Sequence, residues 1–429
     1  MNHRLNRIRS ILCLALPLGA ALAACAPAPT PSTVAPIGAT PTITAVPTKT
    51  PTIIPTSYSQ ALPSVSPEVR TPVPTSAPNL SVTIHRIQMI DSSTGWAEGQ
   101  LRTDKGLRIL RTTDGGSSWT DISPDPSLNY GRSFFLDAEL AWVMAHSDNQ
   151  AWRTRDGGQT WEALAGESWS FDEIWFNDSD HGWKVDSEPG YGITSFSTTD
   201  DGGLTWEEVN PPPGGGLPFG FPNELTAWAI QARMFGDAHA GPWLAVPIEI
   251  DTTNDGGDTW ISRMLPNPPD TRIIDSYDWG PILGGAEDCF FLSPVYNSTA
   301  IWKFALVCYW NSWIYTSANQ GKTWIISPMP AGAYLRDIEF INPTVGWLFV
   351  AEFEESKRNL YQTTDGGQSW TLIKRTGWLD VELSFVDAQM GWAVACDNAY
   401  CSEPVAVRAL LKTSDGGLTW EILEPQFVP

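Results

Sequence analysis

The sequence predicts an all-β fold, namely a seven-bladed β-propeller of four-stranded blades that follows a disordered linker. Three observations lead to this prediction. An eight-residue motif occurs seven times, and a second motif alternates with it along the chain. The 429 residues also include 22 Trp, 36 Gly and 35 Pro, with few long apolar helical runs, which is typical of many short strands and turns. Sheets of this kind bury both of their faces when they stack radially into a closed ring.

The first motif is TTDGGQSW at 363–370, with copies at 112–119, 154–161, 199–206, 253–260 and 413–420 and a decayed copy, SANQGKTW, at 317–324. Its Asp carboxylate can accept hydrogen bonds from backbone N–H groups of a turn, and its two Gly residues permit positive φ. The Trp that follows opens a strand and offers a large apolar anchor. We therefore expect a tight turn between two strands at each copy. Structural roles are predicted for Asp114, Asp156, Asp201, Asp255, Asp365 and Asp415.

The second motif ends a strand with Asp or Asn, makes a short turn and opens another strand with Gly-Trp or Ala-Trp. Its copies lie at 87–99, 134–144, 174–185, 221–230, 338–350 and 383–395. We expect a degraded copy for the fifth blade around Cys289-Phe290-Phe291. Each repeat then has four strands, a to d, with the first motif in the c–d turn. The ring is expected to start near Val82 and finish near Leu423, and the sequence leaves open whether residues 80–84 add an outer strand where it closes.

The motifs resemble the BNR or Asp-box family. With the interleaved Gly-Trp strands, they look most like the photosystem II stability/assembly factor type of seven-bladed propeller, over about residues 82–424. The resemblance implies the fold more than the function, because Asp boxes occur in sialidases, xyloglucan-cleaving hydrolases, sortilin-like receptors and non-enzymatic scaffolds. The photosynthetic factor uses a basic surface patch. This chain has no run of Arg or Lys, which argues against that specific role.

The N-terminus reads as a secretory signal over residues 1–24, with three Arg residues before the apolar stretch Ile11–Ala23. The segment ends in Leu-Ala-Ala-Cys, which resembles a bacterial lipobox. The resemblance implies cleavage before Cys25 and lipid attachment to it; the alternative is an ordinary signal peptide that contains a Cys. We expect an extracytoplasmic lipoprotein that is anchored in the membrane of the cell envelope.

Residues 25–79 are rich in Pro and Thr and are expected to form a disordered tether. The predicted propeller spans residues 80–429. Residues 81–429 contain 21 basic and 47 acidic residues, a net charge of −26, which argues against nucleic acid and anionic membranes as partners. We expect a monomer that binds a protein or glycan at the cell surface and touches the membrane only through its lipid.

Four cysteines remain beyond the signal region: Cys289, Cys308, Cys396 and Cys401. An even number in an oxidising compartment suggests two disulfides. Proximity along the chain favours Cys396–Cys401 and Cys289–Cys308. No spacing matches a zinc site, and the sequence indicates no metal and no cofactor.

The connections between strands predict where function lies. The a–b and c–d turns share one face of the disc, and the b–c and d–a connections share the other. Every large insertion is expected in the second group, at 231–249, 263–282, 293–300, 351–358 and 396–406. Because binding loops on a rigid scaffold vary in this way, we predict a functional surface on that face over blades 4 to 7.

Aromatic and acidic residues in these insertions are the candidate ligand-binding residues. They are Asp237, His239, Trp243, Tyr277, Asp278, Trp279 and Glu354. The Trp and Tyr side chains suit stacking on sugar rings or anchoring of a protein; the alternative for Trp243 and Trp279 is that they only fix their own loops to the disc. A solvated role for His239 is favoured over metal ligation.

No catalytic constellation stands out. The chain has no Gly-rich phosphate loop and no Ser-His-Asp signature, and the Arg86 environment, expected to be strand surface, only faintly resembles a sialidase start. A glycosidase needs two carboxylates at a set separation, and among so many acidic residues the sequence nominates none. The predicted function is a non-catalytic binding or assembly scaffold. The alternatives are a glycoside hydrolase of sialidase-like or xyloglucan-cleaving type acting at the variable loops, and a photosystem assembly factor-like role.

Overall fold

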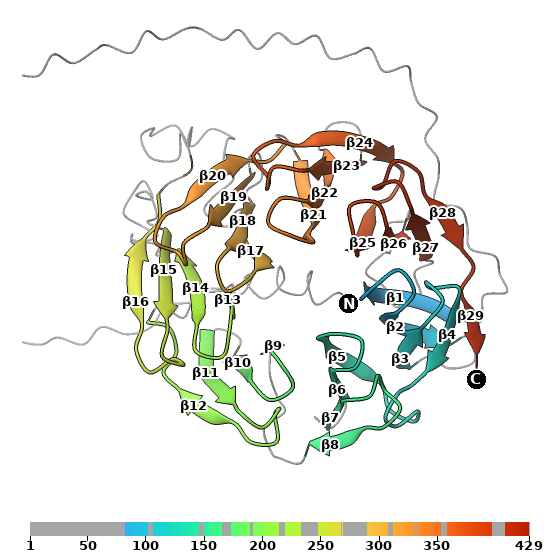
Figure 1. Cartoon of the computed structure of the whole chain (residues 1–429), viewed down its shortest axis with the longest axis horizontal. Coiled ribbons are helices and arrows are strands. Elements are labelled where there is room, and N and C mark those ends of the chain that lie inside the picture. The colour runs from blue at the N-terminus through green and yellow to red at the C-terminus, as the bar shows by residue number, and fades with distance from the viewer. Residues whose placement is uncertain are drawn as a thin grey trace, which may run out of the picture. The chain divides into compact units, whose positions relative to one another are not determined.

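The computed structural model describes residues 82–101, 106–145, 150–164, 173–188, 192–213, 219–232, 248–266, 268, 290–307, 312–330, 333–352, 358–396 and 408–428. These residues form seven antiparallel four-stranded sheets arranged in a ring (Figure 1). Each sheet is a meander in which strands adjacent in sequence are hydrogen-bonded neighbours. The predicted seven-bladed β-propeller is therefore confirmed. The signal and the tether lie outside the described residues.

The blades follow one another in chain order, and each starts with its innermost strand. Blades 1 to 3 consist of β1 (Val82–Met89), β2 (Gly95–Leu101), β3 (Leu107–Thr112), β4 (Ser118–Asp121); β5 (Tyr130–Phe135), β6 (Ala141–Ala145), β7 (Ala151–Thr154), β8 (Glu162–Leu164); β9 (Glu173–Phe176), β10 (Gly182–Glu188), β11 (Gly192–Thr199) and β12 (Glu207–Val209). Blades 4 and 5 consist of β13 (Phe219–Gly220), β14 (Ala227–Ala232), β15 (Ile248–Thr253), β16 (Ile261–Met264); β17 (Phe290–Asn297), β18 (Trp302–Val307), β19 (Ser312–Ser317) and β20 (Ile325–Pro328). Blades 6 and 7 consist of β21 (Ala333–Phe340), β22 (Gly346–Glu352), β23 (Arg358–Thr363), β24 (Thr371–Thr376); β25 (Asp380–Phe385), β26 (Gly391–Cys396), β27 (Ala409–Thr413) and β28 (Glu421–Leu423).

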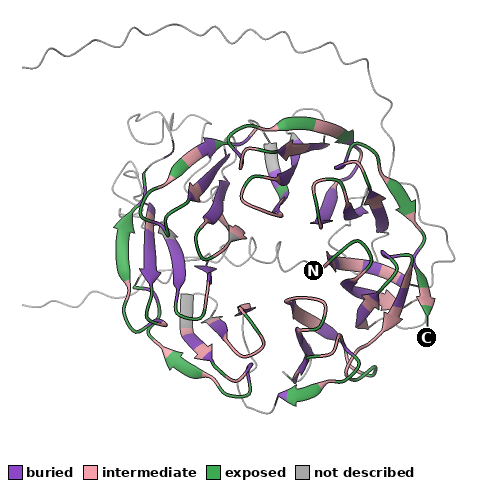
Figure 2. Cartoon of the chain, viewed as in Figure 1, coloured by how far each residue is buried: buried purple, intermediate pink, exposed green. Residues whose placement is uncertain are grey.

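Burial follows the position of a strand within its blade. The second strands are apolar on both faces because neighbouring blades cover both, and β6 and β26 are buried along their whole length. The outermost strands are exposed, as Figure 2 shows around the rim and as all four residues of β16 illustrate. Each main apolar cluster joins two adjacent blades, for example β22 and β23 with β25 and β26.

The ring closes through the C-terminal strand β29 (Gln426–Val428), which pairs in parallel with β4 and makes the sheet of blade 1 five-stranded. Residues 82–84, which the sequence offered as part of an outer closing strand, instead belong to the innermost strand β1. Leu423 ends β28, and the chain then passes Pro425 to reach the neighbouring blade. The last blade therefore has its own four strands, and the closing strand lies on the outer edge of the first blade.

Tryptophans at the start of the second strands hold adjacent blades together. The Trp142 indole stacks on Phe176 of the next blade at 3.6 Å between centroids, and Trp347 stacks on Phe385 at the same distance. The Nε1–H of Trp347 also donates to the backbone oxygen of Gly416 in the Asp box of the next blade, at 2.9 Å. Trp142 and Trp392 likewise donate to the box residues Gly202 and Gly115. Trp96 and Trp183 donate instead to Asp137 and Asn223 in the a–b turn of the next blade.

The Gly before such a Trp has a steric reason. A Cβ on Gly391 would lie 2.3 Å from the Phe385 ring of the preceding strand, so the ring packs directly on the backbone. This close contact leaves no room for a side chain, which explains why Gly precedes Trp in the motif.

Blade 5 departs from this pattern, and our expectation for it was wrong. The region around Cys289-Phe290-Phe291 is where β17 begins, not the turn motif; Cys289 itself is outside the described residues. The counterpart of Gly-Trp is Trp302-Lys303, because Trp302 pairs with Ser317 as Gly346 pairs with Thr363.

Lys303 therefore occupies the position that Trp holds elsewhere. Its Nζ donates to the backbone oxygen of Gly366 in the next Asp box at 2.7 Å and lies 4.5 Å from the centroid of the Phe340 ring. Lys303 is 1% exposed. Burial lowers its pKa to about 8, and the Asp365 carboxylate opposes this shift. Trp302 is displaced to the other face of the strand, where it contacts Trp228 of blade 4.

The Asp-box tryptophans have a smaller share in the core than the sequence suggested. Trp119 is fully buried because β29 lies beside it, with Phe427 as its partner in the register. The corresponding residues of the other blades are only partly buried, at Trp161, Trp206, Trp260, Trp324, Trp370 and Trp420.

We predict that Trp347→Ala lowers the free energy of unfolding by about 3–5 kcal/mol, because it removes a buried ring, a stack and a hydrogen bond between blades. Trp370→Ala should cost clearly less, because that ring is partly exposed on the outer strand. Urea unfolding of both variants provides the comparison. Equal losses would show that the second-strand Trp has no special role.

Candidate functional site

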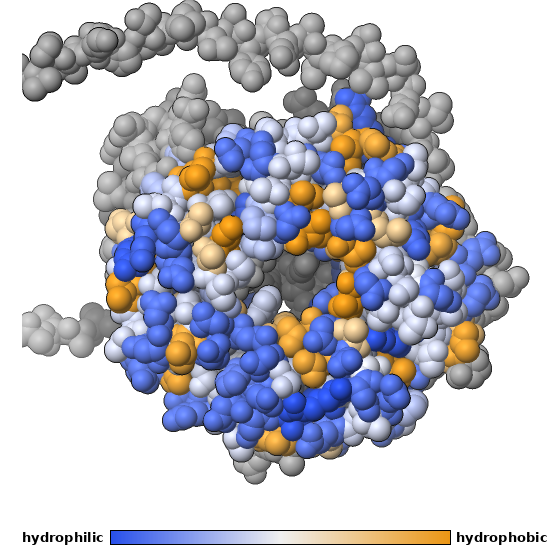
Figure 3. Space-filling model, in the orientation of Figure 1, coloured by the Kyte–Doolittle hydropathy of each residue, from blue (hydrophilic) through white to orange (hydrophobic). Residues whose placement is uncertain are grey.

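The two ends of the strands form two different faces. The a–b turns and Asp boxes lie together on one, here called the Asp-box face, because the first Gly of a box donates to the a–b turn of its own blade. Gly115 N bonds Ser93 O at 2.7 Å, and Gly416 N bonds Gln389 O at 2.8 Å. The b–c and d–a connections lie at the opposite ends of the strands, on the variable-loop face. Figure 3 shows one face of the ring, which is hollowed at its centre.

Each Asp box is closed by its own hydrogen bonds. In blade 6 the Asp365 Oδ1 accepts from Ser369 N at 2.9 Å and from the Thr363 hydroxyl at 2.8 Å, while Oδ2 accepts from the Ser369 hydroxyl at 2.6 Å. The two glycines have φ of 80° and 90°, a region that favours glycine. The same bonds recur at Asp114, Asp156, Asp201, Asp255 and Asp415.

The decayed box in blade 5 keeps the same shape with different chemistry. Asn319 Oδ1 accepts from Thr323 N at 2.8 Å, and its Nδ2 donates to the Thr323 hydroxyl. Gln320 takes the place of the first Gly with φ of 58°. This turn therefore forms without a carboxylate.

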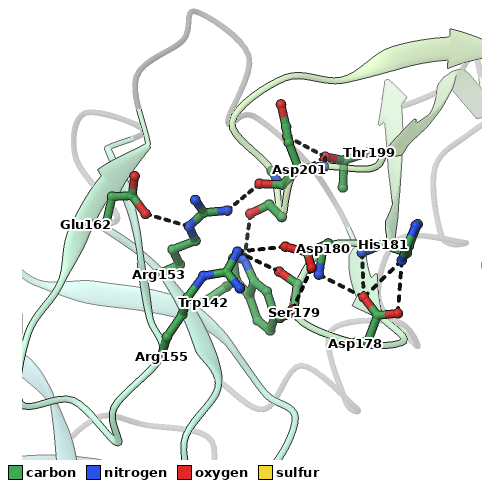
Figure 4. Close-up of polar contacts among 12 residues, drawn as sticks. Trp142, Arg153, Arg155, Glu162, Asp178, Ser179, Asp180, His181, Thr199 and Asp201 are labelled. Atoms are coloured by element: carbon green, nitrogen blue, oxygen red, sulfur yellow. Dashed lines mark hydrogen bonds and ion pairs between the residues drawn. The ribbon is translucent and has the colours of Figure 1, made fainter.

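Figure 4 shows how the Asp-box face is connected between blades 2 and 3. The Arg153 guanidinium pairs with Glu162 at 2.8 Å and donates to the backbone oxygen of Asp201 in the next box. Arg155 donates to Ser179 O and, at 2.8 Å, to the Asp180 carboxylate. These charged groups hold two turns of neighbouring blades together.

The a–b turn of blade 3, which contains Ser179 and Asp180, also contains the pair His181–Asp178, with 2.9 Å between Nδ1 and Oδ2. The hydrogen bond that the Asp178 carboxylate accepts raises the pKa of His181. By contrast, hydrogen bonds lower the pKa of the Asp255 carboxyl to about 2. The Thr259 hydroxyl and backbone N–H make the largest contributions, and the Thr253 hydroxyl comes next. The aspartates of this face are thus ionised acceptors that stabilise turns, which is a structural role.

The predicted ligand-binding residues were assigned to the variable-loop face from the sequence alone. All of them lie outside the described residues: Asp237, His239, Trp243, Tyr277, Asp278, Trp279 and Glu354. Their roles stay predictions. One predicted insertion is corrected, because residues 293–297 continue β17 and Ser298–Ile301 form its a–b turn on the Asp-box face.

The cysteine predictions are also untested. Cys396 is fully buried at the end of β26. Cys25, Cys289, Cys308 and Cys401 lie outside the described residues, so lipid attachment and both disulfide pairings stay predictions.

The innermost strands of blades 6, 7, 1 and 2 are joined by polar side chains. Asp337 Oδ2 accepts from Leu383 N at 2.7 Å, and Glu382 Oε1 accepts from Ile87 N at 3.3 Å in the next blade. Alternate residues repeat the pattern, with Glu339 bonded to Phe385 N and Ser384 bonded to Met89 N. These carboxylates therefore serve the backbone of the neighbouring strand.

Arg86 lies in the same network and is not the surface residue that the sequence suggested. Its guanidinium is 3.1 Å from Glu98 and 3.8 Å from Glu382, and it donates to Ser133 of blade 2. It thus links three blades around the axis.

Beta-bulges in the inner strands place extra residues toward the variable-loop face. The register shifts at His85 in β1 and at Arg336 in β21 occur at equivalent positions, four residues before the strands end at Met89 and Phe340. A bulge leaves its residue outside the ladder and redirects the side chain, which is common beside functional sites.

Four residues form what we call the inner-rim cluster: His85, Arg336, Asp380 and Arg408. Arg408 lies just before β27, and Asp380 opens β25. Arg336 is exposed, whereas Asp380 and Arg408 are 8% and 7% exposed. His85 Nε2 and Asp380 Oδ1 are buried atoms without a hydrogen-bond partner among the described residues.

The electrostatics of this cluster are unusual for so acidic a protein. Burial, and then the Arg408 charge, lowers the pKa of His85 to about 4, so the imidazole is neutral near pH 7. Burial raises the pKa of Asp380 against the opposing charges of Arg408 and Arg336. The cluster therefore combines a buried neutral ring nitrogen and a buried carboxyl group with the exposed Arg336 side chain, which a polar ligand can reach.

Sequence reasoning missed the inner-rim cluster. No motif marks it, because His85 and Arg336 are set apart only by a bulge and Arg408 follows a b–c connection. The signal that could have found it was the presence of charged residues in otherwise apolar inner strands.

No group of three or more His, Cys, Asp or Glu that could hold a metal occurs in the part of the chain that the structure describes. The same residues include no helix long and apolar enough to span a membrane.

Comparisons with known proteins bear on the fold. No protein-family model matches the chain, and no curated protein sequence matches it. Among solved structures it is similar to an uncharacterized protein from Listeria monocytogenes EGD-e, with 7% identity, a TM-score of 0.49 and coverage of 84% of this chain and 98% of that one.

Two further similarities are to YCF48 from Cyanidioschyzon merolae and to the GH74 xyloglucanase from Xanthomonas campestris. For the first the identity is 16%, the TM-score 0.45 and the coverage 80% and 98% of the two chains. For the second these values are 15%, 0.43, and 68% and 44%. Likeness at this level concerns the fold and carries no conclusion about activity.

The two described histidines, which lie on opposite faces, predict opposite pH dependences of the free energy of unfolding. The pKa of His85 is below its ordinary value of 6.5, so the unfolded chain binds more protons between pH 6.5 and 4. The free energy of unfolding should fall over that range as the pH is lowered, by at most about 3 kcal/mol. His85→Gln should remove this fall.

His181→Gln is the matched control. The pKa of His181 is raised, so its stabilising contribution is present below pH 6.5 and is lost as the pH rises. Urea unfolding between pH 4 and 8 measures both variants. An unchanged profile in His85→Gln would contradict the assignment of a buried neutral imidazole.

Proposed function

We propose that the protein is a non-catalytic binding scaffold whose partner, a protein or glycan at the cell surface, docks on the variable-loop face. The observation that carries this proposal is the contrast between the two faces. Each box aspartate of the Asp-box face that we described accepts bonds within its own turn, as Asp365 does. The opposite face bears the b–c and d–a connections, which differ in length from blade to blade.

The inner-rim cluster gives this face a polar anchor near the axis. The Arg336 side chain is exposed and can donate hydrogen bonds to a partner group, whereas Asp380 Oδ1 and His85 Nε2 are buried beside it. Long connections around such an anchor would add contact area. A rigid ring that presents adaptable loops is a common way to build a binding surface.

The propeller's charge restricts the partner. With −26 over residues 81–429, most of the surface repels acidic molecules and favours a neutral glycan or a protein with a basic patch. The lipid predicted on Cys25 would keep the propeller at the cell surface near such partners.

A glycoside hydrolase is the second candidate, and one observation favours it. The pKa of Asp380 is raised by burial, with the Asp337 carboxylate adding to the rise, as a general acid requires. Against this candidate, Asp337 is held by the backbone N–H of Leu383 at 2.7 Å, and both carboxyl groups are nearly buried.

The test combines binding with cleavage. We would apply the protein to a glycan array and to polysaccharide pull-downs, seek protein partners by crosslinking at the cell surface, and assay every bound sugar for hydrolysis. Arg336→Gln should weaken partner binding by about tenfold, which corresponds to one lost hydrogen bond to a charged group. Glu139→Gln on the Asp-box face should leave binding unchanged, because the hydrogen bonds of Glu139, from Gly157 N and to Asp137 Oδ1, involve its backbone.

The outcomes separate the candidates. Binding without hydrolysis supports the scaffold. Hydrolysis of a bound sugar that Asp380→Asn abolishes would overturn it in favour of the glycosidase. Equal loss of binding in Arg336→Gln and Glu139→Gln would place the partner elsewhere on the ring.

A further inference from the structure

The outer edge of blade 1 shows how a blade of this propeller accepts an additional strand. Gln426 N donates to Ser117 O at 3.0 Å, and β29 continues in parallel with Phe427 opposite Trp119. The pairing recruits Ser118 and Trp119 into β4, whereas the outer strands of the other six blades begin after the box Trp. The sheets of those six blades end at their fourth strand.

Charged side chains distinguish most of these edges. Such residues on an edge strand oppose pairing with another chain. Blades 2, 3 and 7 have Glu directly after the box Trp, and the outer strand of blade 6 carries Lys and Arg: these residues are Glu162, Glu207, Glu421, Lys374 and Arg375.

In two of these edges, the carbonyl that corresponds to Ser117 O already accepts a hydrogen bond from a side chain. The counterparts of Ser117 O are Asp258 O in blade 4 and Leu418 O in blade 7. The first accepts from Asn210 Nδ2 at 2.9 Å, and the second accepts from Lys374 Nζ at 3.1 Å. An incoming strand would have to displace these donors.

Blade 5 differs in both respects. Its outer strand β20 contains no charged residue, and Ile325 stands where blade 1 has Thr120, the partner of Val428. The Ile325 side chain is 60% exposed, and Trp324 beside it is partly buried. β20 lies on the outer rim of the ring (Figure 1). The counterpart of Ser117 O is Lys322 O, to which no donor among the described residues is bonded. Beyond the exposed Lys322 side chain, this edge therefore presents an apolar surface.

We propose that the outer edge of blade 5, from Thr323 to Ile325, docks an extended strand of a partner protein in parallel with β20. The strand is uncharged and carries an aromatic residue followed by a β-branched one, as Phe427 and Val428 do in β29. Backbone bonds supply the pairing, and the aromatic ring covers Trp324 as Phe427 covers Trp119. The site is separate from the variable-loop face.

The test uses the chain's own closing strand as the probe. A synthetic peptide of residues 422–429 carries photoreactive benzoylphenylalanine in place of Phe427 and is irradiated with the full-length protein, and the crosslinks are mapped by mass spectrometry. Most crosslinks should fall within residues 323–327. Ile325→Glu should reduce them about fivefold or more, and Ile422→Glu on β28 should leave them unchanged. A peptide with Gln426→Pro, which lacks the donor to the carbonyl, should not crosslink.

Three results would overturn the proposal. Crosslinks spread over all outer edges would show no preference for blade 5. Crosslinks confined to Trp119 would show exchange with β29. A lower melting temperature in Ile325→Glu than in Ile422→Glu would show that the chain itself already covers this edge.

Discussion

The contact between a second-strand tryptophan and the next blade is the interaction on which this ring depends. A single blade leaves two apolar faces, and the fold is stable only when neighbours cover both. Trp347 shows how this is done, because its ring stacks on Phe385 while its Nε1–H satisfies a backbone oxygen of the adjacent Asp box. Each such residue thus joins the core of one junction to a turn on the Asp-box face. The Asp boxes hold their acceptor oxygens in place through their own carboxylates and glycines, so the second-strand and box motifs serve one purpose.

Most of the fold could be predicted from the sequence because the same local chemistry is repeated in every blade. The positive φ of the box glycines and the close approach of Phe385 to Gly391 leave unmistakable residues at fixed spacings. Blade 5 escaped this reasoning because Lys303 reproduces both contacts of the Trp with different chemistry, a charge-assisted hydrogen bond and a cation–π contact. The closing strand escaped it because three residues that pair in parallel with a distant strand leave no local pattern.

The candidate site was less predictable for a physical reason. The inner-rim cluster arises from two bulges and from the meeting of the first and last blades, which are far apart in sequence, so neither His85 nor Asp380 is marked by its neighbours. The residues first favoured, such as Trp243 and Trp279, lie outside the described residues. The division of labour between the faces accounts for both groups: one face is occupied with stabilising turns, and the other retains buried polar atoms and connections that can vary without disturbing the ring.

The central claim is that the second-strand tryptophan sets the strength of each junction between blades. Hydrogen–deuterium exchange of the intact protein at pH 7, resolved by strand, tests it most directly. The junction of blades 5 and 6 uses the buried Lys303 in place of an indole, so the amides of β18 should exchange faster than those of β22 and β26. Equal protection of the three strands, or earliest exchange at the junction of blades 7 and 1 where Trp392 bonds Gly115, would contradict the claim.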